Sequence, residues 1–344
     1  MFAKLKRYSN WMQRHVASVD WEFSSNGDVV GDITHFALLR YLQVMRKILL
    51  VYNPVSGHAA FKNRLDAVIE SFQQRGILLS VYRTQADDNS TFADCVKLSG
   101  VEGVIAAGGD GTLHAVINWL KKNSLDMPVG VLGSGTSNDF ATHLHLDDET
   151  FFDAVAVGHT RPVDLGLVNG KEFFVNVASA GVFTSIAHEV NSRLKNFLGK
   201  SAYYLRGLGE LKNFRAVPLD ITADSEKFSV EAFLFLVLNS PAVAGFKKIS
   251  RAARVDDGKL DLLALKKCST AGLLGLTKKL LAGDSVDGDE NILTLQARTF
   301  EIKSAAKLVG DCDGEAGDPL PLKIETVPRA IKFFAQASKR GELP

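Results

Sequence analysis

Three short stretches combine glycine with serine, threonine or asparagine, and each follows an apolar run. They are NPVSG at residues 53–57, GGDGT at 108–112 and GSGTSND at 133–139. Glycine lets the backbone approach a ligand closely, and free N–H groups at the start of a helix favour phosphate. One glycine-rich stretch is common in ordinary turns, but three of them are hard to explain as turns alone. The sequence therefore predicts a nucleotide site.

These stretches lie where apolar, strand-like runs alternate with helix-like segments. The pattern predicts strands at 47–52, 77–84, 103–109 and 127–135. It predicts helices at 59–76, at 90–100 with Ser90 as the N-cap, from about residue 112, and from residue 136. Such alternation is typical of a parallel sheet covered by helices on both faces, and ligands of these sheets lie beyond the carboxyl ends of the strands.

The pattern changes at about residue 161. The dipeptide Asn169-Gly170 predicts a tight hairpin, and strand-like runs at short intervals follow. The expected fold is α/β, with an N-terminal doubly wound parallel-sheet nucleotide domain and a mostly antiparallel β-rich second domain. We expect an N-terminal extension at 1–44, the nucleotide-binding domain at 45–160, the β-rich second domain at 161–335 and a tail at 336–344.

Composition excludes several classes of protein. The 344 residues include 40 basic and 39 acidic side chains, so no overall positive field attracts nucleic acid. Three widely spaced cysteines without CxxC spacing indicate a reducing compartment and argue against a disulfide framework or a structural zinc site. No run reaches the roughly 18 apolar residues of a membrane span, and the first residues lack the apolar core of a secretory signal. We therefore expect a cytoplasmic protein.

The motifs resemble those of the diacylglycerol kinase catalytic-domain superfamily, which includes bacterial soluble lipid kinases and the sphingosine and ceramide kinases. The likeness rests on NPVSG, GGDGTLHAVIN and GSGTSNDFA, and it continues through VDLGLVNGKEFFVNVASAG and DDGKLDLLAL to DGE at 313–315. It implies ATP-dependent phosphorylation of a lipid hydroxyl, with the nucleotide held between two domains. The GGDG motif alone is shared with NAD kinases and phosphofructokinases.

The resemblance assigns roles residue by residue. In DGE, Asp313 matches the general base, and Gly314 and Glu315 complete its catalytic motif. Phosphoryl transfer to a hydroxyl needs a carboxylate that orients the hydroxyl and accepts its proton. The alternatives are that Asp110 only stabilises its own loop and that DGE belongs to a solvated acidic loop. The implied nucleotide-binding residues are Asn53, Ser56, Thr84, Gly108, Gly109, Asp110, Gly111, Thr112, Thr136 and Asn138.

The resemblance also implies magnesium in two places. One ion accompanies ATP and neutralises the β- and γ-phosphate oxygens, with few protein ligands of its own. A second, structural Mg²⁺ would be held by the carboxylate of Asp257 and the backbone carbonyls of Arg254 and Lys259. Asp-Asp-Gly is also a common turn sequence, so a turn without metal remains the alternative.

Three positions depart from the family pattern. Ala115 stands where the family usually has Glu, His58 where Lys is frequent after Ser-Gly, and Thr142 where Arg is frequent after NDFA. These losses near the phosphates either weaken catalysis or accompany a changed substrate. Because the DGE motif is present, an active enzyme is the preferred interpretation.

The expected partner is a lipid substrate, reached at the inner membrane surface by a peripheral protein. Basic, aromatic residues at 195–215 and 246–254 are candidates for contact with that surface, or they are ordinary solvated faces. Homodimer formation stays open. Two other function classes also remain: a soluble-metabolite kinase of the NAD-kinase type, and a catalytically weak lipid-binding relative.

Overall fold

The computed structural model describes residues 46–56, 60–86, 88–133, 140, 148–181, 215–243, 245–246 and 249–336. The contacts within the chain define a compact unit that begins at Arg46. The predicted positions Thr136 and Asn138, the departures His58 and Thr142, and nearly all of the stretch 195–215 lie outside the described residues. No helix in these ranges is long and apolar enough to cross a membrane.

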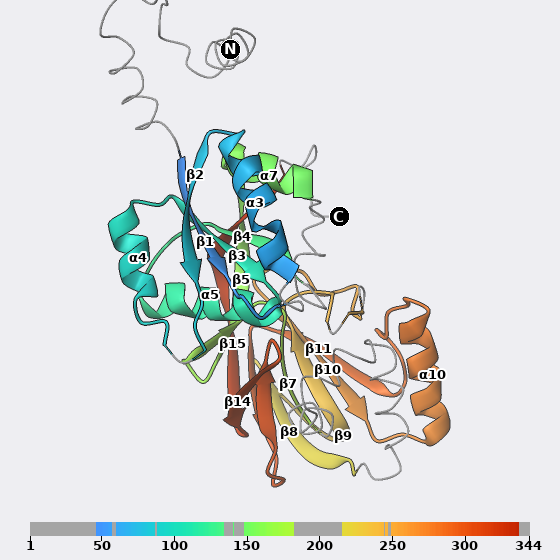
Figure 1. The fold of residues 1–344 in the computed structure, drawn as a ribbon. Coiled ribbons are helices and arrows are strands. Elements are labelled where there is room, and N and C mark those ends of the chain that lie inside the picture. The colour runs from blue at the N-terminus through green and yellow to red at the C-terminus, as the bar shows by residue number, and fades with distance from the viewer. Residues whose placement is uncertain are drawn as a thin grey trace, which may run out of the picture. The chain divides into compact units, whose positions relative to one another are not determined.

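The first part of the unit is a parallel sheet with strand order β2-β1-β3-β4 (Figure 1). Its strands are β1 (Arg46–Tyr52), β2 (Ile77–Arg83), β3 (Gly103–Gly108) and β4 (Val129–Gly133). The helices between and after them are α3 (Ala60–Gln73), α4 (Phe92–Ser99), α5 (Asp110–Lys122) and α7 (Asp148–Val157). The predicted strands and the first three helices agree with this order.

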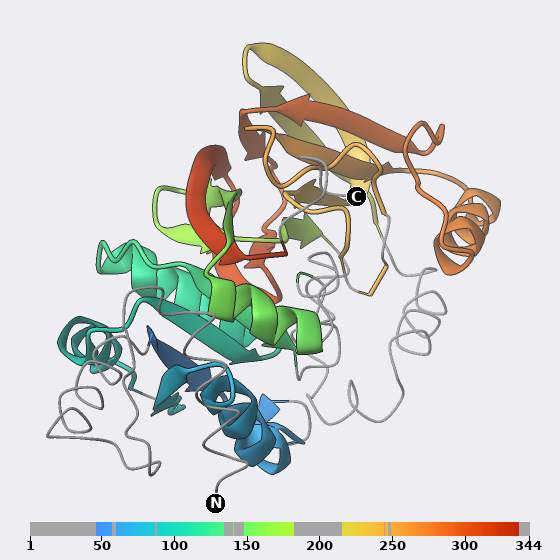
Figure 2. The same ribbon diagram turned by 90° about the horizontal axis from the view of Figure 1, so that it is seen from above.

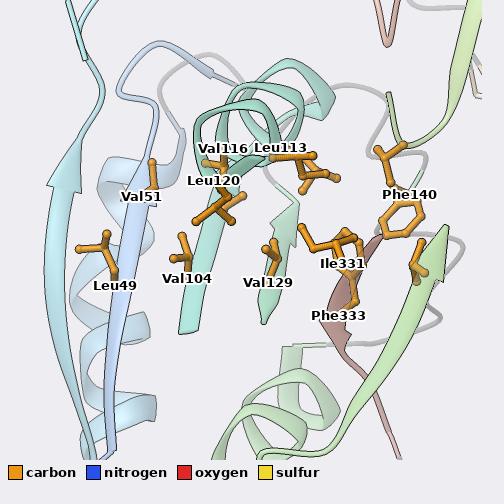
Figure 3. Close-up of a cluster of buried hydrophobic side chains, with 14 of the residues drawn as sticks. Leu49, Val51, Val104, Leu113, Val116, Leu120, Val129, Phe140, Ile331 and Phe333 are labelled. Atoms are coloured by element: carbon orange, nitrogen blue, oxygen red, sulfur yellow. The ribbon is translucent and has the colours of Figure 1, made fainter. Parts of the chain in front are cut away.

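Alternating side chains of the strands supply two separate cores, as a sheet covered on both faces requires. In β1, Leu49 and Val51 belong to the core under α4 and α5, whereas Ile48 and Leu50 belong to the core under α3 and α7. Figure 3 shows the first core, with Leu113, Val116 and Leu120 of α5 above strand residues such as Val104 and Val129. The spacing of these three helix residues is that of one helical face.

The second part is built from mostly antiparallel strands, and Figure 2 shows the helix α10 (Thr270–Leu281) beside them in orange. A buried cluster rich in Phe, Leu, Ile and Val fills its interior. The fold class predicted from the sequence is therefore confirmed. The strands are β5 (Thr160–Val168), β6 (Glu172–Phe174), β7 (Val177–Gly181), β8 (Val217–Ala223), β9 (Glu226–Leu238), β10 (Leu260–Lys266), β11 (Ile292–Ala297), β12 (Thr299–Lys303), β13 (Val309–Cys312), β14 (Glu315–Pro319) and β15 (Leu322–Phe334).

The long strand β15 joins the two parts. Its first half pairs with β12, and at its far end Phe333 pairs with Val129 of β4, while β5 runs antiparallel along most of its length. The strands thus form one hydrogen-bonded sheet. The expected division near residue 160 is not marked by a break in that sheet, so two separate domains remain a prediction.

Local structure confirms the hairpin and corrects one cap. Asn169 and Gly170 have φ of 50° and 66° and connect β5 to β6, as the Asn-Gly signal predicts. The predicted N-cap Ser90 is wrong: Thr91 occupies the N-cap of α4 in a helical conformation and makes no capping hydrogen bond through its side chain. Helix α10, which sequence analysis did not predict, has Ser269 as its N-cap, and the Ser269 hydroxyl accepts a hydrogen bond from the N–H of Gly272.

The contact of Gly166 with Phe174 gives a first prediction. The two residues pair across β5 and β6, and a Cβ added to Gly166 would lie 2.0 Å from the ring of Phe174. We expect Gly166→Ala to lower the free energy of unfolding by about 1–3 kcal/mol, because the buried ring must move. Urea denaturation measures this loss. Gly275→Ala is the control, since its added Cβ meets nothing within 4 Å; equal stability of both variants would contradict the prediction.

Candidate active site

The carboxyl ends of three parallel strands bring Asn53, Thr84 and Gly108 to the same edge of the sheet. The N–H of Asn53 donates to Ala107 O at 3.2 Å, and the N–H of Thr84 donates to Tyr52 O at 3.0 Å. The Asn53 side chain also accepts from the N–H of Val55 at 3.0 Å, and Ser56 N–H donates to Asn53 O at 3.3 Å. The predicted residues that follow β1, β2 and β3 therefore do lie together.

The glycine loop forms the junction between β3 and α5. Gly109 is the N-cap of α5, and no side chain caps the helix from this position. Its φ of −89° and ψ of −174° are ordinary extended values, so the glycine serves close approach rather than a left-handed turn. Gly108 is needed for space, because an added Cβ would lie 2.2 Å from the hydroxyl oxygen of Thr112. A helix N-terminus without a capping side chain is a site suited to a phosphate group.

The carboxylate of Asp313 is buried in the turn after β13 and is fully engaged. Its side chain is 1% exposed. Oδ1 accepts from the N–H groups of Asn176 at 2.8 Å and Val177 at 3.0 Å, and Oδ2 accepts from Val175 N–H at 2.8 Å. A general base must reach the proton that it accepts. In this structure the oxygens of Asp313 hold the turn, and a general-base role for Asp313 stays a prediction.

Glu315 is the exposed carboxylate that faces the glycine loop. A Cβ added to Gly111 would lie 2.6 Å from Glu315 Oε1, which shows how closely this side chain approaches the start of α5. Asp313 and Gly314 turn the chain toward it with φ of 53° and 94°. Gly314 N–H donates to Asp311 Oδ1 at 3.0 Å and supports the same turn. The second residue predicted as catalytic therefore lies beside the glycine loop.

His114 was not identified from the sequence, although it lies within the GGDGT stretch as it continues into α5. Its side chain is 6% exposed, and both ring nitrogens face carboxylates. Nδ1 lies 3.3 Å from Asp313 Oδ2, and Nε2 lies 2.9 Å from Glu172 Oε1. Burial alone would lower the pKa of His114, but the hydrogen bonds and charges of Asp313 and Glu172 raise it to about 10. The imidazole is therefore a buried cation at neutral pH.

Asn118, one turn further along α5, joins the same helix to the β6 segment. Its Nδ2 donates to Phe173 O at 2.9 Å and its Oδ1 accepts from Phe173 N–H at 2.9 Å. The imidazolium of His114 and the proximity of Lys122 at 3.7 Å hold the pKa of Glu172 below its usual value, although burial opposes this. His114 and Asn118 are polar residues at i and i+4 on an otherwise apolar helix face. This spacing was the sequence feature that could have identified them.

The predicted metal residues lie in the loop before β10. Buried Asp164 accepts from Gly258 N–H at 2.6 Å and from Arg329 N–H at 2.7 Å, and Asp257 accepts from Lys259 N–H at 3.0 Å. Burial raises the pKa of Asp257, and the charge of Asp164 adds to this increase. Burial, with a smaller contribution from Asp257, also raises the pKa of Asp261 to about 6.

Negative charge therefore accumulates near this loop. Asp261 Oδ2 is buried without a hydrogen-bond partner, and a cation would offset the negative charge that surrounds it. The described residues contain no cluster of three or more His, Cys, Asp or Glu side chains suited to a metal. Ligation would therefore depend on the backbone carbonyls of Arg254 and Lys259 together with the carboxylate of Asp257.

A phosphotransferase needs a place for phosphate and a nearby carboxylate, and here these are the N-terminus of α5 and Glu315. Comparison with known proteins identifies the chain as a kinase. Residues 47–168 match the family described as the diacylglycerol kinase catalytic domain, and residues 176–335 match the YegS C-terminal NAD kinase beta sandwich-like domain. The chain belongs to the diacylglycerol kinase family and is a lipid kinase.

Proteins named diacylglycerol kinase align with most of this chain. A diacylglycerol kinase of Bacillus subtilis (strain 168) is 34% identical over 303 residues, which are 87% of this chain and 99% of the relative. One of Staphylococcus haemolyticus is 33% identical over 286 residues, 82% of this chain and 86% of the relative. A crystal structure of a diacylglycerol kinase from Bacillus anthracis shares the fold, with a TM-score of 0.70 and 24% identity over 85% of this chain and 97% of that one.

Gly111 offers a test of how Glu315 is placed. We expect Gly111→Ala to displace the Glu315 carboxylate and to lower kcat about tenfold or more, because small displacements of a catalytic group are costly. The free energy of unfolding should change little, since the atom that must move is the end of a flexible, exposed side chain. Steady-state kinetics and urea denaturation measure the two effects. A variant with the kcat of the wild type would show that the closeness of Glu315 to Gly111 does not matter for turnover.

The raised pKa of His114 predicts a pH-dependent stability. In the unfolded chain the imidazole loses its proton near pH 6.5, whereas in the folded protein it keeps it up to about pH 10. Its contribution to stability is therefore fully present below about pH 6.5 and is lost as the pH rises through about 10. The difference in unfolding free energy between the wild type and His114→Gln should shrink over that interval. A difference independent of pH would contradict the charged state.

Proposed function

We propose that the protein transfers the γ-phosphate of ATP to the free hydroxyl of diacylglycerol at a membrane surface. The curated relatives named diacylglycerol kinase support this acceptor, since two of them align with more than four fifths of the chain. The observation that carries the proposed chemistry is the approach of Glu315 Oε1 to Gly111, at the uncapped start of α5. This arrangement favours a kinase over a lipid-binding protein without activity.

The phosphates of ATP would bind at the glycine loop. The N-terminus of α5 offers backbone N–H groups and the positive end of the helix dipole. Asn53 and Thr84 flank this loop at the ends of β1 and β2, and Asp110 and Thr112 begin the helix. Ser56, Thr136 and Asn138 complete the proposed set on the strength of their motifs.

In the proposed reaction Glu315 orients the lipid hydroxyl and accepts its proton. The hydroxyl oxygen forms a new bond to the γ-phosphorus, and the bond between that phosphorus and the β–γ bridging oxygen breaks. ADP departs with the bridging oxygen, and the proton stays on the Glu315 carboxylate until solvent removes it. Asp313 does not touch the reactants in this scheme and keeps the DGE turn in place.

Magnesium has two proposed places. With ATP it would neutralise charge on the β- and γ-phosphate oxygens. In the loop before β10, Asp257 and the carbonyls of Arg254 and Lys259 would hold a structural ion. This loop is linked to β15 through Asp164, which accepts from both Gly258 N–H and Arg329 N–H.

We also propose that the enzyme works as a peripheral protein on the cytoplasmic membrane surface. Of the basic residues considered for this contact, Arg215, Arg251 and Arg254 are exposed in the described structure. Cationic side chains near anionic lipid contribute on the order of 1 kcal/mol each, and added salt weakens them. The remaining candidates, at 195–214 and at residues 247–248, are proposed from their sequence alone.

The acceptor and the base are tested together with labelled ATP. We expect phosphate transfer to diacylglycerol and none to NAD, with ceramide and sphingosine as further acceptors in the panel. Glu315→Gln should lower kcat by about 10²–10⁴, the usual contribution of a general base, without changing the Kd for ATP. Glu325→Gln, an exposed glutamate on β15, is the matched control. Wild-type turnover in Glu315→Gln would refute the base, and transfer to NAD alone would refute the lipid acceptor.

A further inference from the structure

We propose that His114 is a positioning residue, which as an imidazolium ties the nucleotide helix α5 to Asp313 and Glu172 and thereby holds Glu315 against the glycine loop. This inference rests on the proposed role of Glu315 as the base. It concerns a residue that makes no direct contact with Glu315 in the described structure and acts through the turn that precedes it.

The hydrogen-bond partners of His114 favour the charged form. Both Asp313 Oδ2 and Glu172 Oε1 belong to carboxylates, which only accept hydrogen bonds when ionised. A neutral imidazole has one N–H and would leave one of these contacts without a proton. The raised pKa of His114 agrees with this geometry.

The groups around the imidazole come from each element that packs against it. Asp313 belongs to the turn after β13 and Glu172 to β6, and Lys122 of α5 reaches Glu172 at 3.7 Å. The Nδ2 atom of Asn118 also lies 3.4 Å from Nε2 of His114. The thiol of Cys312, next to Asp313, is neutral because burial and the neighbouring carboxylates raise its pKa. His114 is therefore the cation placed between two acidic groups.

A short chain of constraints leads from this cation to Glu315. The same Asp313 carboxylate that faces His114 also accepts from three consecutive N–H groups, at Val175, Asn176 and Val177. The backbone of Asp313 is tied as well, since its N–H donates to Val177 O at 2.9 Å. Glu315 follows two residues later, after the left-handed pair Asp313 and Gly314. His114 lies three residues after Gly111 on α5. Its side chain therefore connects the glycine loop to the turn that precedes Glu315.

A purely structural histidine would give different results in a kinetic experiment. Its loss would lower stability, yet the folded fraction of the variant would turn over normally. A positioning residue changes kcat in protein that is fully folded, while the KM for ATP changes little because the phosphate loop is intact. A lower kcat with a nearly unchanged KM for ATP therefore distinguishes a positioning residue from a purely structural one.

The test uses His114→Gln, with His159→Gln as the matched control. His159 is a half-buried histidine bonded to the carbonyl of Ala335, outside the site. At a temperature where each protein is folded, we expect kcat of His114→Gln to fall about tenfold or more and the KM for ATP to change less than about twofold. His159→Gln should keep both constants. Wild-type kcat in His114→Gln would overturn the proposal.

Two further measurements do not depend on activity. In protein labelled with ¹⁵N in the imidazole rings, the resonances absent from His114→Gln identify this residue. They should show two protonated nitrogens at pH 8, where an unperturbed histidine is neutral. Hydrogen exchange of peptides covering 172–178 and 310–316 should be faster in His114→Gln than in the wild type. A neutral ring at pH 8, or unchanged exchange, would overturn the link.

The outcomes separate this inference from the proposed function. If Glu315→Gln loses turnover while His114→Gln keeps it, the base assignment stands and the positioning role is wrong. If Glu315→Gln keeps turnover, the base assignment fails, and the positioning role that rests on it fails with it. A double-mutant cycle with Glu172→Gln adds a check, because losses through one shared link should be less than additive.

Discussion

The carboxylate of Asp313 is the interaction on which the site depends. Three backbone N–H groups and one buried imidazole converge on its two oxygens, and its side chain is almost inaccessible to solvent. Such a group cannot lose its partners cheaply, because an ionised carboxylate without hydrogen bonds is very unfavourable in a protein interior. The turn that carries Gly314 and Glu315 is therefore held as firmly as the strands around it.

The sheet explains how the turn at Asp313, which is distant in sequence, lies close to the glycine loop. His114 and Asp313 are 199 residues apart in the chain. Strand β15 pairs with β5 and β12 and then meets β4 at Val129, so the parallel and antiparallel strands share one hydrogen-bonded frame. The β5–β6 hairpin adds Glu172 and Phe173, which contact His114 and Asn118 of α5. A rigid frame of this kind fixes a catalytic carboxylate better than a free loop does.

Much of the frame could be predicted from local patterns. Apolar runs, the strand ends at Asn53 and Gly108 and the Asn169-Gly170 turn depend on neighbours in sequence, and they agree with the structure, whereas most of GSGTSND lies outside the described residues. Helix α10 was not predicted, and Gly272 and Gly275, both poor helix formers, lie within it. The N-cap of α4 differed by one residue, from Ser90 to Thr91.

The parts of the site that escaped prediction depend on burial by distant segments. Nothing within DGE shows that the N–H groups of residues 175–177 donate to Asp313, so motif position alone suggested Asp313 as the base. His114 lies within GGDGTLHAVIN, but its proposed positioning role depends on Asp313 and Glu172. Only the folded sheet brings these two residues near His114. Motifs indicated strand ends that the structure does bring together, whereas the different surroundings of Asp313 and Glu315 became visible only in the structure.

A crystal structure with a non-hydrolysable ATP analogue and a short-chain diacylglycerol would show whether Glu315 contacts the acceptor. We expect the phosphates at the start of α5 and the acceptor hydroxyl within about 2.6–3.2 Å of a Glu315 carboxylate oxygen. Asp313 should keep its three N–H partners and lie out of reach of the lipid. A hydroxyl bound to another carboxylate, or phosphates bound away from the glycine loop, would contradict this expectation.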